Sequence, residues 1–136
     1  SQDVVLMVGV RDIDTLERER LVKSDIQSVE WLEGRPQADL DVLLTELAKR
    51  VDEVYVHIDM DSLDPEVAPG FPAFMAPGGM TLSQVEEAVR AVAVRFRIKA
   101  ATVATFNPEH DTEGKALKVG LRLIEVLGEI GGNKAR

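Results

Sequence analysis

The sequence predicts an α/β fold with a mainly parallel β-sheet and helices on both of its faces. Apolar runs of strand length alternate with segments of helical periodicity along the chain, which is typical of βαβ units. The run VVLMVGV at 4–10 contains no polar residue, as expected for a strand that is buried on both faces. Polar residues follow each clear strand, at the sheet edge where α/β proteins form their sites.

The first strand leads into a short helix and a possible second strand. In RDIDTLERERLVKS, Asp14 or Thr15 can cap a helix whose first-turn acids lie near its positive end. IQSVEW at 26–31 is a possible short strand, and EGRPQ at 33–37 is a loop because it contains glycine and proline. We therefore expect a strand, a helix and a strand before residue 38.

An amphipathic helix and a strand occupy the middle of the chain. Leucines recur at helical spacing between 38 and 50, at Leu40, Leu43, Leu44 and Leu47. EVYVHID at 53–59 is rich in β-branched residues and predicts the next strand. The loop at 62–80 follows it, with four prolines and three glycines.

The last third of the chain predicts a helix, a strand and a closing helix. Thr81 is a suitable N-cap for the segment LSQVEEAVRAVAVRF, in which Val85, Ala88, Val89 and Val92 share one face. IKAATVATF at 98–106 is the third clear strand. ALKVGLRLIEVLGEI is the closing helix, which the glycines of GGN should end.

Length and composition limit the classes of function. The chain has 136 residues, enough for one modest domain, and a net charge of −8 with a pI near 4.8. This acidity argues against binding to nucleic acid or to anionic membranes. The chain lacks cysteine, which excludes disulfides and thiolate metal sites and fits a cytoplasmic location. No apolar run reaches the roughly 18 residues of a membrane span.

The chain begins at Ser1 and enters a strand almost at once, which suggests a portion of a larger domain.

Three acids within six positions follow the strand at 53–59, in the stretch HIDMDSLDP. Because side chains alternate along a strand, His57, Asp59 and Asp61 should share a face. Two carboxylates on one face repel each other unless a cation lies between them or one is protonated. Oxygen ligands favour Mg²⁺, Mn²⁺ or Ca²⁺. The pair either binds such a cation or only decorates a turn.

The residues after this pair carry a resemblance to a known family. The spacing of D-x-D, proline, Pro-Gly and glycine in IDMDSLDPEVAPGFPAFMAPGG resembles the signature of the arginase, agmatinase and formiminoglutamase ureohydrolases. The residues in register are Ile58, Asp59, Met60, Asp61, Pro65, Pro69, Gly70 and Gly78. VGVRDID at 8–14, GGMT at 78–81 and TFNPEHD at 105–111 are also similar to segments of this family.

The resemblance implies a three-layer αβα fold of the arginase type, with residues 1–136 as the C-terminal portion of a single domain. It implies a hydrolase for a guanidino or formimino C–N bond, in which a paired Mn²⁺ centre activates water. Asp59 would bridge both ions and Asp61 would bind one of them. Asp14 and Glu17 match positions that contact the substrate. The family usually forms trimers or hexamers, so we expect a homo-oligomer or pairing with a missing N-terminal half.

Two departures from the family pattern limit this expectation. The Gly-Gly-Asp-His and Asp-Ala-His-x-Asp segments that supply the other metal ligands do not occur here, so the chain is a fragment, a split half or a degenerate homologue. Thr105 also stands where the family has a guanidinium-binding glutamate, and a hydroxyl cannot form a charge-assisted fork. We keep Thr105 as a substrate-binding position, and its hydroxyl favours a formimino or other amidine substrate, or loss of activity, over arginase activity.

Other polar residues have simpler interpretations. We expect His57 to be a core histidine with a satisfied hydrogen bond, His110 to lie at the surface and Asp64 to shape the loop.

Two alternative functions remain open. HIDMDSLD also resembles the D-x-D-x-T motif of haloacid-dehalogenase-type phosphatases, and an arginase-like chain without a complete metal site would be a non-catalytic partner.

Overall fold

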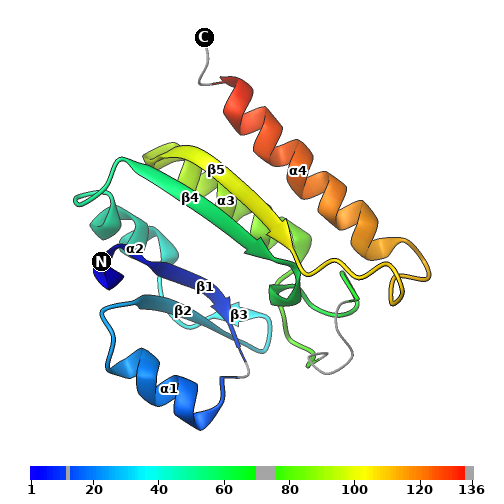
Figure 1. Ribbon diagram of the computed structural model, residues 1–136, viewed down its shortest axis with the longest axis horizontal. Coiled ribbons are helices and arrows are strands. Elements are labelled where there is room, and N and C mark those ends of the chain that lie inside the picture. Colours follow the sequence, from blue (N-terminus) through cyan, green and yellow to red (C-terminus); the bar gives the residue numbers. More distant parts are fainter. Residues whose placement is uncertain (12, 70–75, 134–136) are drawn as a thin grey trace.

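The computed structural model describes residues 1–11, 13–69 and 76–133 (Figure 1). The strands are β1 (Leu6–Val10), β2 (Gln27–Leu32), β3 (Arg35–Pro36), β4 (Glu53–Asp59) and β5 (Arg97–Ala104). The helices are α1 (Thr15–Val22), α2 (Leu40–Leu47), α3 (Leu82–Arg95) and α4 (Lys115–Asn133), with 3-10 turns η1 (Gln2–Val4) and η2 (Met60–Ser62). The alternation of strands and helices predicted from the sequence is therefore confirmed.

The strands of the described residues form two separate sheets. β1 pairs with β2 in parallel and β2 pairs with β3 antiparallel, whereas β4 and β5 form a parallel pair of their own. In the second pair Asp59 lies opposite Ala104, so β4 and β5 end together at one edge. The mainly parallel pairing is confirmed, and β3 is a short strand inside the segment 33–37 that we predicted as a loop.

One hydrophobic core joins the two sheets and three of the helices. It includes Val29 and Trp31 of β2, Ile58 of β4, and residues of α3 and α4. Leu123 and Val126 of α4 are completely buried. Helix α3 contacts α2, α4 and β5, and α4 also contacts β5 (Figure 1). The two sheets therefore belong to one packed unit.

The layer predicted on the second face of the sheet is largely missing from the described residues. Helix α1 has no buried residue, and its Val22 is 80% exposed. Val5 and Met7 of the first apolar run are 41% and 40% exposed, and Tyr55 of β4 is 59% exposed. Our expectation that the strands are buried on both faces was therefore wrong here. The described residues supply packing partners mainly for one face of the strands.

Local capping explains where the helices begin. The Asp14 carboxylate accepts hydrogen bonds from the backbone N–H groups of α1, Asp39 does the same for α2, and Thr81 forms a capping box with Gln84 at α3. The predicted end of the last helix was wrong, because α4 continues through 131–133. Its strongly apolar packing face offsets the poor helix propensity of glycine.

Within the described ranges, no helix has the length and apolar character needed to cross a membrane.

Candidate functional site

Asp59 and Asp61 lie at the carboxyl end of β4. Asp59 is the last residue of the strand and caps η2, and its Oδ1 atom accepts a hydrogen bond from the Asp61 backbone N–H at 3.0 Å. Because Asp61 belongs to the 3-10 turn, the strand alternation that we extended to it stops at Asp59. Asp59 is exposed and Asp61 is partly buried. The turn, rather than the strand, therefore sets the relative position of the two carboxylates.

His57 lies on the exposed face of β4, so the prediction of a core histidine was wrong. Its ring centroid is 6.4 Å from that of Tyr55, and the Tyr55 hydroxyl donates to Thr102 Oγ1 on the neighbouring strand at 2.7 Å. The strand itself was predicted correctly. The error concerns the layer that would cover this face, which a strand pattern cannot locate.

Arg11 is the residue that sequence reasoning missed. It directly follows β1, and its Nη2 atom donates to the carbonyl oxygens of Asp61 and Leu63, each at 2.9 Å. Its Nη1 atom donates to the carbonyl oxygen of Ala76. A lone arginine directly after a run of apolar residues was the available signal. Its partners lie 50 or more residues away in the chain, so no local pattern identifies them.

Asp64 shapes the loop after β4, as predicted. Its Oδ1 atom accepts from the Glu66 N–H at 3.0 Å, and its Oδ2 atom accepts from the N–H groups of Gly78 and Gly79 at 2.8 and 3.2 Å. These hydrogen bonds, that from Glu66 first, and the charge of Arg11 hold the pKa of the Asp64 carboxyl below its usual value. The aspartate therefore fastens the two ends of the loop together.

Gly78 and Gly79 are both required by this loop. Gly78 has φ +90°, in the left-handed region that favours glycine. A Cβ atom on Gly79 would lie 2.5 Å from the backbone nitrogen of Asp64. The loop therefore needs glycine at both positions for backbone reasons. Asp12, Gly70 and residues 71–75 of the predicted loop lie outside the described residues.

Thr105 follows the residue that pairs with Asp59, so β5 brings it to the same edge of the sheet as the acidic turn. It has φ +65°, a conformation that is strained for a β-branched residue. The side-chain oxygen of Asn107 accepts from the Glu109 N–H at 3.0 Å and begins the next turn. Thr105 therefore lies where strand geometry ends, and its substrate role stays a prediction.

Asp14 and Glu17 form a reciprocal capping box at the start of α1. Asp14 Oδ1 accepts from the N–H groups of Leu16 and Glu17 at 2.7 and 2.9 Å, and Glu17 Oε2 accepts from the Asp14 N–H at 3.4 Å. Both residues are exposed. Both acids therefore stabilise the start of α1, as expected for acids in a first helical turn. Their contacts with substrate stay a prediction.

His110 is exposed, in agreement with the expected surface position. The neighbouring Asp111 accepts hydrogen bonds from the N–H groups of Ala116 and Leu117 at 2.9 and 2.8 Å. This acid therefore caps α4 from the loop that follows β5.

The donor set of the acidic turn suits a hard divalent cation but does not complete its coordination. Asp59 and Asp61 offer carboxylate oxygens, which Mg²⁺ and Mn²⁺ prefer. No group of three or more His, Cys, Asp or Glu side chains arranged to hold a metal ion occurs among the residues that the structure describes. Two carboxylates cannot fill the roughly six positions of such an ion, so further ligands would have to come from elsewhere.

Comparisons of the sequence with a family model and with curated relatives agree on its family. The model of the arginase family matches residues 1–128. The chain is 33% identical over 105 residues to a formimidoylglutamase of Psychrobacter cryohalolentis, covering 77% of this chain and 30% of that protein. It is 30% identical over 127 residues to mitochondrial arginase 1 of Arabidopsis thaliana, covering 90% of this chain and 35% of that protein. The chain thus spans about a third of these relatives.

Solved structures show the same fold. The arginase of Bacillus caldovelox has a TM-score of 0.77 and 25% identity, and the match covers 97% of this chain and 44% of that one. The arginase of Helicobacter pylori has a TM-score of 0.80 at 19% identity, covering 96% and 43%. The expected arginase-type fold with a mainly parallel sheet, as a partial domain, is thereby confirmed.

Proposed function

This chain belongs to the arginase family, and on that premise we propose that it supplies metal and substrate ligands to a hydrolase of guanidino or formimino C–N bonds. The observation that carries this proposal is the acidic turn. Asp59 and Asp61 stand at the carboxyl end of β4, in a turn fixed by a hydrogen bond between them, with the family signature in register around them. The arginase-family match covers the same segment as the phosphatase-like motif and accounts for it.

In the proposed site, the carboxylates of Asp59 and Asp61 would hold Mn²⁺, with Asp59 as a ligand shared by two ions and Asp61 as a ligand of one. A pair of such ions, when bound, polarises the substrate and lowers the pKa of water. The structure supports this assignment through the oxygen-only donors and the exposure of Asp59. The remaining ligands would come from the part of the family domain that these 136 residues do not contain.

The substrate side of the proposal involves Thr105, Asp14 and Glu17. A threonine hydroxyl donates or accepts one hydrogen bond, which suits a formimino group better than a guanidinium that needs a carboxylate fork. The similarity to a formimidoylglutamase agrees with this preference. The exposed carboxylates of Asp14 and Glu17 would receive an ammonium group of the substrate.

The experiment that tests this function joins the chain with the missing part of the domain. We would co-express it with the segment of Bacillus caldovelox arginase outside the matched region, and measure Mn²⁺ content and release of amide or amine from formimino and guanidino compounds. We expect two Mn²⁺ ions per assembly and hydrolysis of a formimino compound, both lost in Asp59→Asn. The exposed Asp25→Asn serves as the matched control. A metal-replete assembly that hydrolyses neither class would overturn the proposal.

A second candidate is a non-catalytic arginase-like partner. Thr105 in place of a glutamate and the incomplete ligand set favour it. This alternative predicts that the assembly binds no Mn²⁺ even when the ion is supplied at concentrations well above micromolar. The same metal analysis therefore separates the two candidates. Assembly as trimers or hexamers stays a prediction of the family resemblance, and a cytoplasmic location stays a prediction from the lack of cysteine.

A further inference from the structure

Both backbone polar groups of Asp61 are held by side chains from other positions. The Asp61 N–H group donates to Asp59 Oδ1 at 3.0 Å, and the Asp61 carbonyl oxygen accepts from Arg11 Nη2 at 2.9 Å. The planar peptide groups on either side of a residue fix the direction of its Cα–Cβ bond. These two hydrogen bonds therefore set the direction in which the Asp61 carboxylate leaves the turn.

Only one of these two hydrogen bonds is independent of a bound cation. Asp59 is itself a ligand in the proposed site, so a cation competes with the Asp61 N–H group for the Asp59 oxygens. The acceptors of Arg11 are the backbone carbonyl oxygens of Asp61, Leu63 and Ala76, none of which is a ligand in the proposed site. Arg11 therefore holds Asp61 whether or not a cation is present.

This hold matters because the two carboxylates of the turn carry like charge. Asp59 and Asp61 are separated by a single residue, and without a cation their negative charges favour separation. A side chain that is already aligned loses less conformational freedom when its ligand arrives, so the binding is tighter. A guanidinium suits this task, because its planar fork presents several N–H donors in a fixed geometry.

A bulge in β1 determines on which face of the strand Arg11 lies. The register between β1 and β2 shifts between Val8 and Val10, so Gly9 is an extra residue in β1. An extra residue moves the side chains that follow it to the opposite face of the strand. Bulges are frequent next to active sites, where they re-aim a side chain. The side chain that this bulge re-aims is the Arg11 guanidinium.

Gly9 also lies directly against the acidic turn. It has φ +78°, and a Cβ atom there would lie 2.7 Å from Met80 Sδ and 3.4 Å from Ser62 Cβ. Met80 is buried, so its side chain has little room to move away. The strand β1 therefore approaches the turn closely at a glycine, two residues before Arg11.

We propose that Arg11 is a positioning residue of the proposed metal site. Its guanidinium aligns the Asp61 carboxylate for Mn²⁺ before the ion binds, and the bulge at Gly9 brings the guanidinium to the turn. Arg11 acts through Asp61 rather than by contact with the ion. The inference rests on the proposed function, because it takes Asp61 as a metal ligand.

The test measures Mn²⁺ affinity in the assembly of this chain with the segment of Bacillus caldovelox arginase outside the matched region. A Mn²⁺ titration is followed by the electron paramagnetic resonance signal of the free ion. We expect Arg11→Ala to weaken Mn²⁺ binding by about 10- to 100-fold, the usual effect of removing a group that orients a metal ligand. Arg11→Lys should regain part of this loss, because an ammonium can donate to a carbonyl oxygen but lacks the fork.

A double-mutant cycle shows whether Arg11 acts through Asp61. In the Asp61→Asn background, Arg11→Ala should change Mn²⁺ affinity by less than about threefold, because the carboxylate that Arg11 aligns is gone. Equal losses in the two backgrounds would show that Arg11 affects the site by another route, and would overturn the proposal.

Gly9→Ala tests the role of the bulge. It should weaken Mn²⁺ binding in the same direction as Arg11→Ala, because the new Cβ pushes β1 away from the turn. Gly114→Ala is its control, since Gly114 has a similar φ of +66° but a Cβ there would meet nothing within 4 Å. Equal effects of the two glycine variants would show that backbone strain alone is responsible, and would remove the bulge from the proposal.

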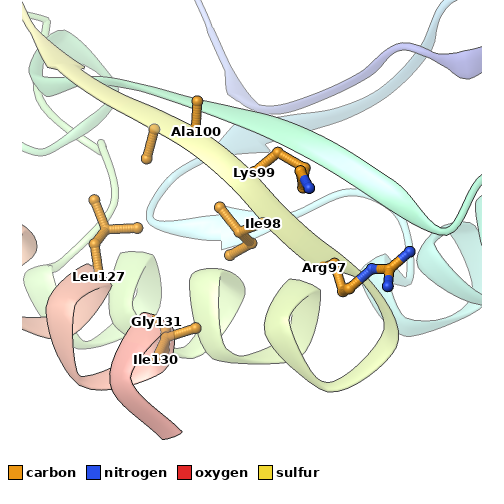
Figure 2. Close-up of a pocket in the computed structure, with 8 residues that line it drawn as sticks. Arg97, Ile98, Lys99, Ala100, Leu127, Ile130 and Gly131 are labelled. Carbon is orange, nitrogen blue, oxygen red and sulfur yellow. The ribbon is translucent and has the colours of Figure 1, made fainter. Parts of the chain in front are cut away.

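Arg97→Ala is the matched control for Arg11→Ala. The Arg97 guanidinium is also engaged, since it pairs with Glu53 at 2.7 Å. Arg97 lies at the start of β5, beside the cavity between β5 and α4 (Figure 2). It pairs with Glu53 at one end of the two strands, whereas Asp59 pairs with Ala104 at the other end. Arg97→Ala should therefore leave Mn²⁺ affinity within about twofold of that of the natural sequence.

An Arg11→Ala assembly that binds Mn²⁺ within about twofold of the natural sequence overturns the proposal. Loss of affinity in Arg97→Ala as large as in Arg11→Ala does the same, because any lost arginine would then suffice. Circular dichroism checks that each variant folds. If Arg11→Ala does not fold, Gly9→Ala carries the test, and an unchanged Mn²⁺ affinity in that variant overturns the proposal.

Failure of this inference and failure of the proposed function are distinguishable. Hydrolysis by an assembly in which Arg11→Ala binds Mn²⁺ as tightly as the natural sequence contradicts the positioning role alone. A Mn²⁺ affinity that depends on Arg11, without hydrolysis of either class of compound, supports the positioning role and contradicts the proposed function. An assembly that binds no Mn²⁺ overturns both.

Discussion

The Nη2 atom of Arg11 lies 2.9 Å from the backbone carbonyl oxygen of Asp61, so the end of β1 is tied to the turn that carries a proposed metal ligand. The same atom donates to the carbonyl oxygen of Leu63 at 2.9 Å. Asp64, the next residue, fastens this stretch to Gly78 and Gly79. The position of Asp61 therefore depends on a guanidinium supplied by the other sheet.

Replacing Arg11 should loosen this connection. Arg11→Ala removes the donors to three carbonyl oxygens and should lower the free energy of unfolding by about 1–3 kcal/mol. Arg11→Lys should lose part of that amount, because an ammonium lacks the planar fork. Urea unfolding followed by circular dichroism measures both. Arg20→Ala, on the exposed helix α1, is the control, and a loss no larger than in this control would show that the contacts add nothing.

Asp64 should give the protein a specific acid sensitivity. Its folded-state pKa is lowered, so the unfolded chain binds more protons between that pKa and about 3.9, the usual value for Asp. Its contribution is therefore complete above about pH 5 and is lost as pH falls through the folded pKa. The free energy of unfolding should fall more steeply below about pH 4 in the natural sequence than in Asp64→Asn. Parallel slopes, with exposed Asp25→Asn as reference, would refute this role.

Gly79 should not tolerate a side chain. A Cβ atom there would lie 2.5 Å from both the Asp64 nitrogen and the Leu63 carbonyl carbon, which are backbone atoms that cannot rotate away. Gly79→Ala should therefore destabilise the fold by about 2 kcal/mol or more. Gly128→Ala is the matched control, because its Cβ would meet nothing within 4 Å and should stabilise α4 by up to about 1 kcal/mol. Thermal unfolding compares the two, and an equal response would contradict the close approach.

Relieving the backbone of Thr105 should stabilise the chain. Its φ of +65° is unfavourable for a β-branched residue, whereas asparagine tolerates this region. Thr105→Asn should raise the free energy of unfolding by about 0.5–1 kcal/mol. Thr102→Asn, in the extended strand β5, should lower it, because asparagine is a poor strand former and the change removes the hydroxyl that accepts from Tyr55. Destabilisation by Thr105→Asn would show that the threonine hydroxyl or methyl makes a contact that outweighs the strain.

Much of the local structure followed from the sequence because its causes lie within a few residues. Asp14 and Thr81 each accept from N–H groups two or three positions ahead, so the pattern of acids, hydroxyls and apolar residues was sufficient to place α1 and α3. The acidic turn at Asp59 has the same short range, since it bonds to Asp61. The signature of constrained glycines and prolines was also visible before its contacts were known.

The exposure of His57 shows what these patterns leave open. Alternation places a side chain on a face of a strand, but whether a layer covers that face depends on distant segments. Among the described residues, the division of the strands into two sheets and the single pairing of β5 have the same origin. The expectation that apolar strands are buried on both faces describes a complete domain, and these residues form only part of one.

By itself, the sequence determined the order of the longer strands and helices, the N-terminal caps of α1 and α3, and the acidic turn of an arginase-family signature. Only the tertiary structure decided that Arg11 holds the Asp61 turn, that Asp64 needs Gly78 and Gly79 as partners, and which strand edges remain open. The physical reason is distance along the chain. Capping and periodicity act over two to four residues, whereas the Arg11 hydrogen bonds join groups 50 to 65 residues apart, which only the packed fold brings together.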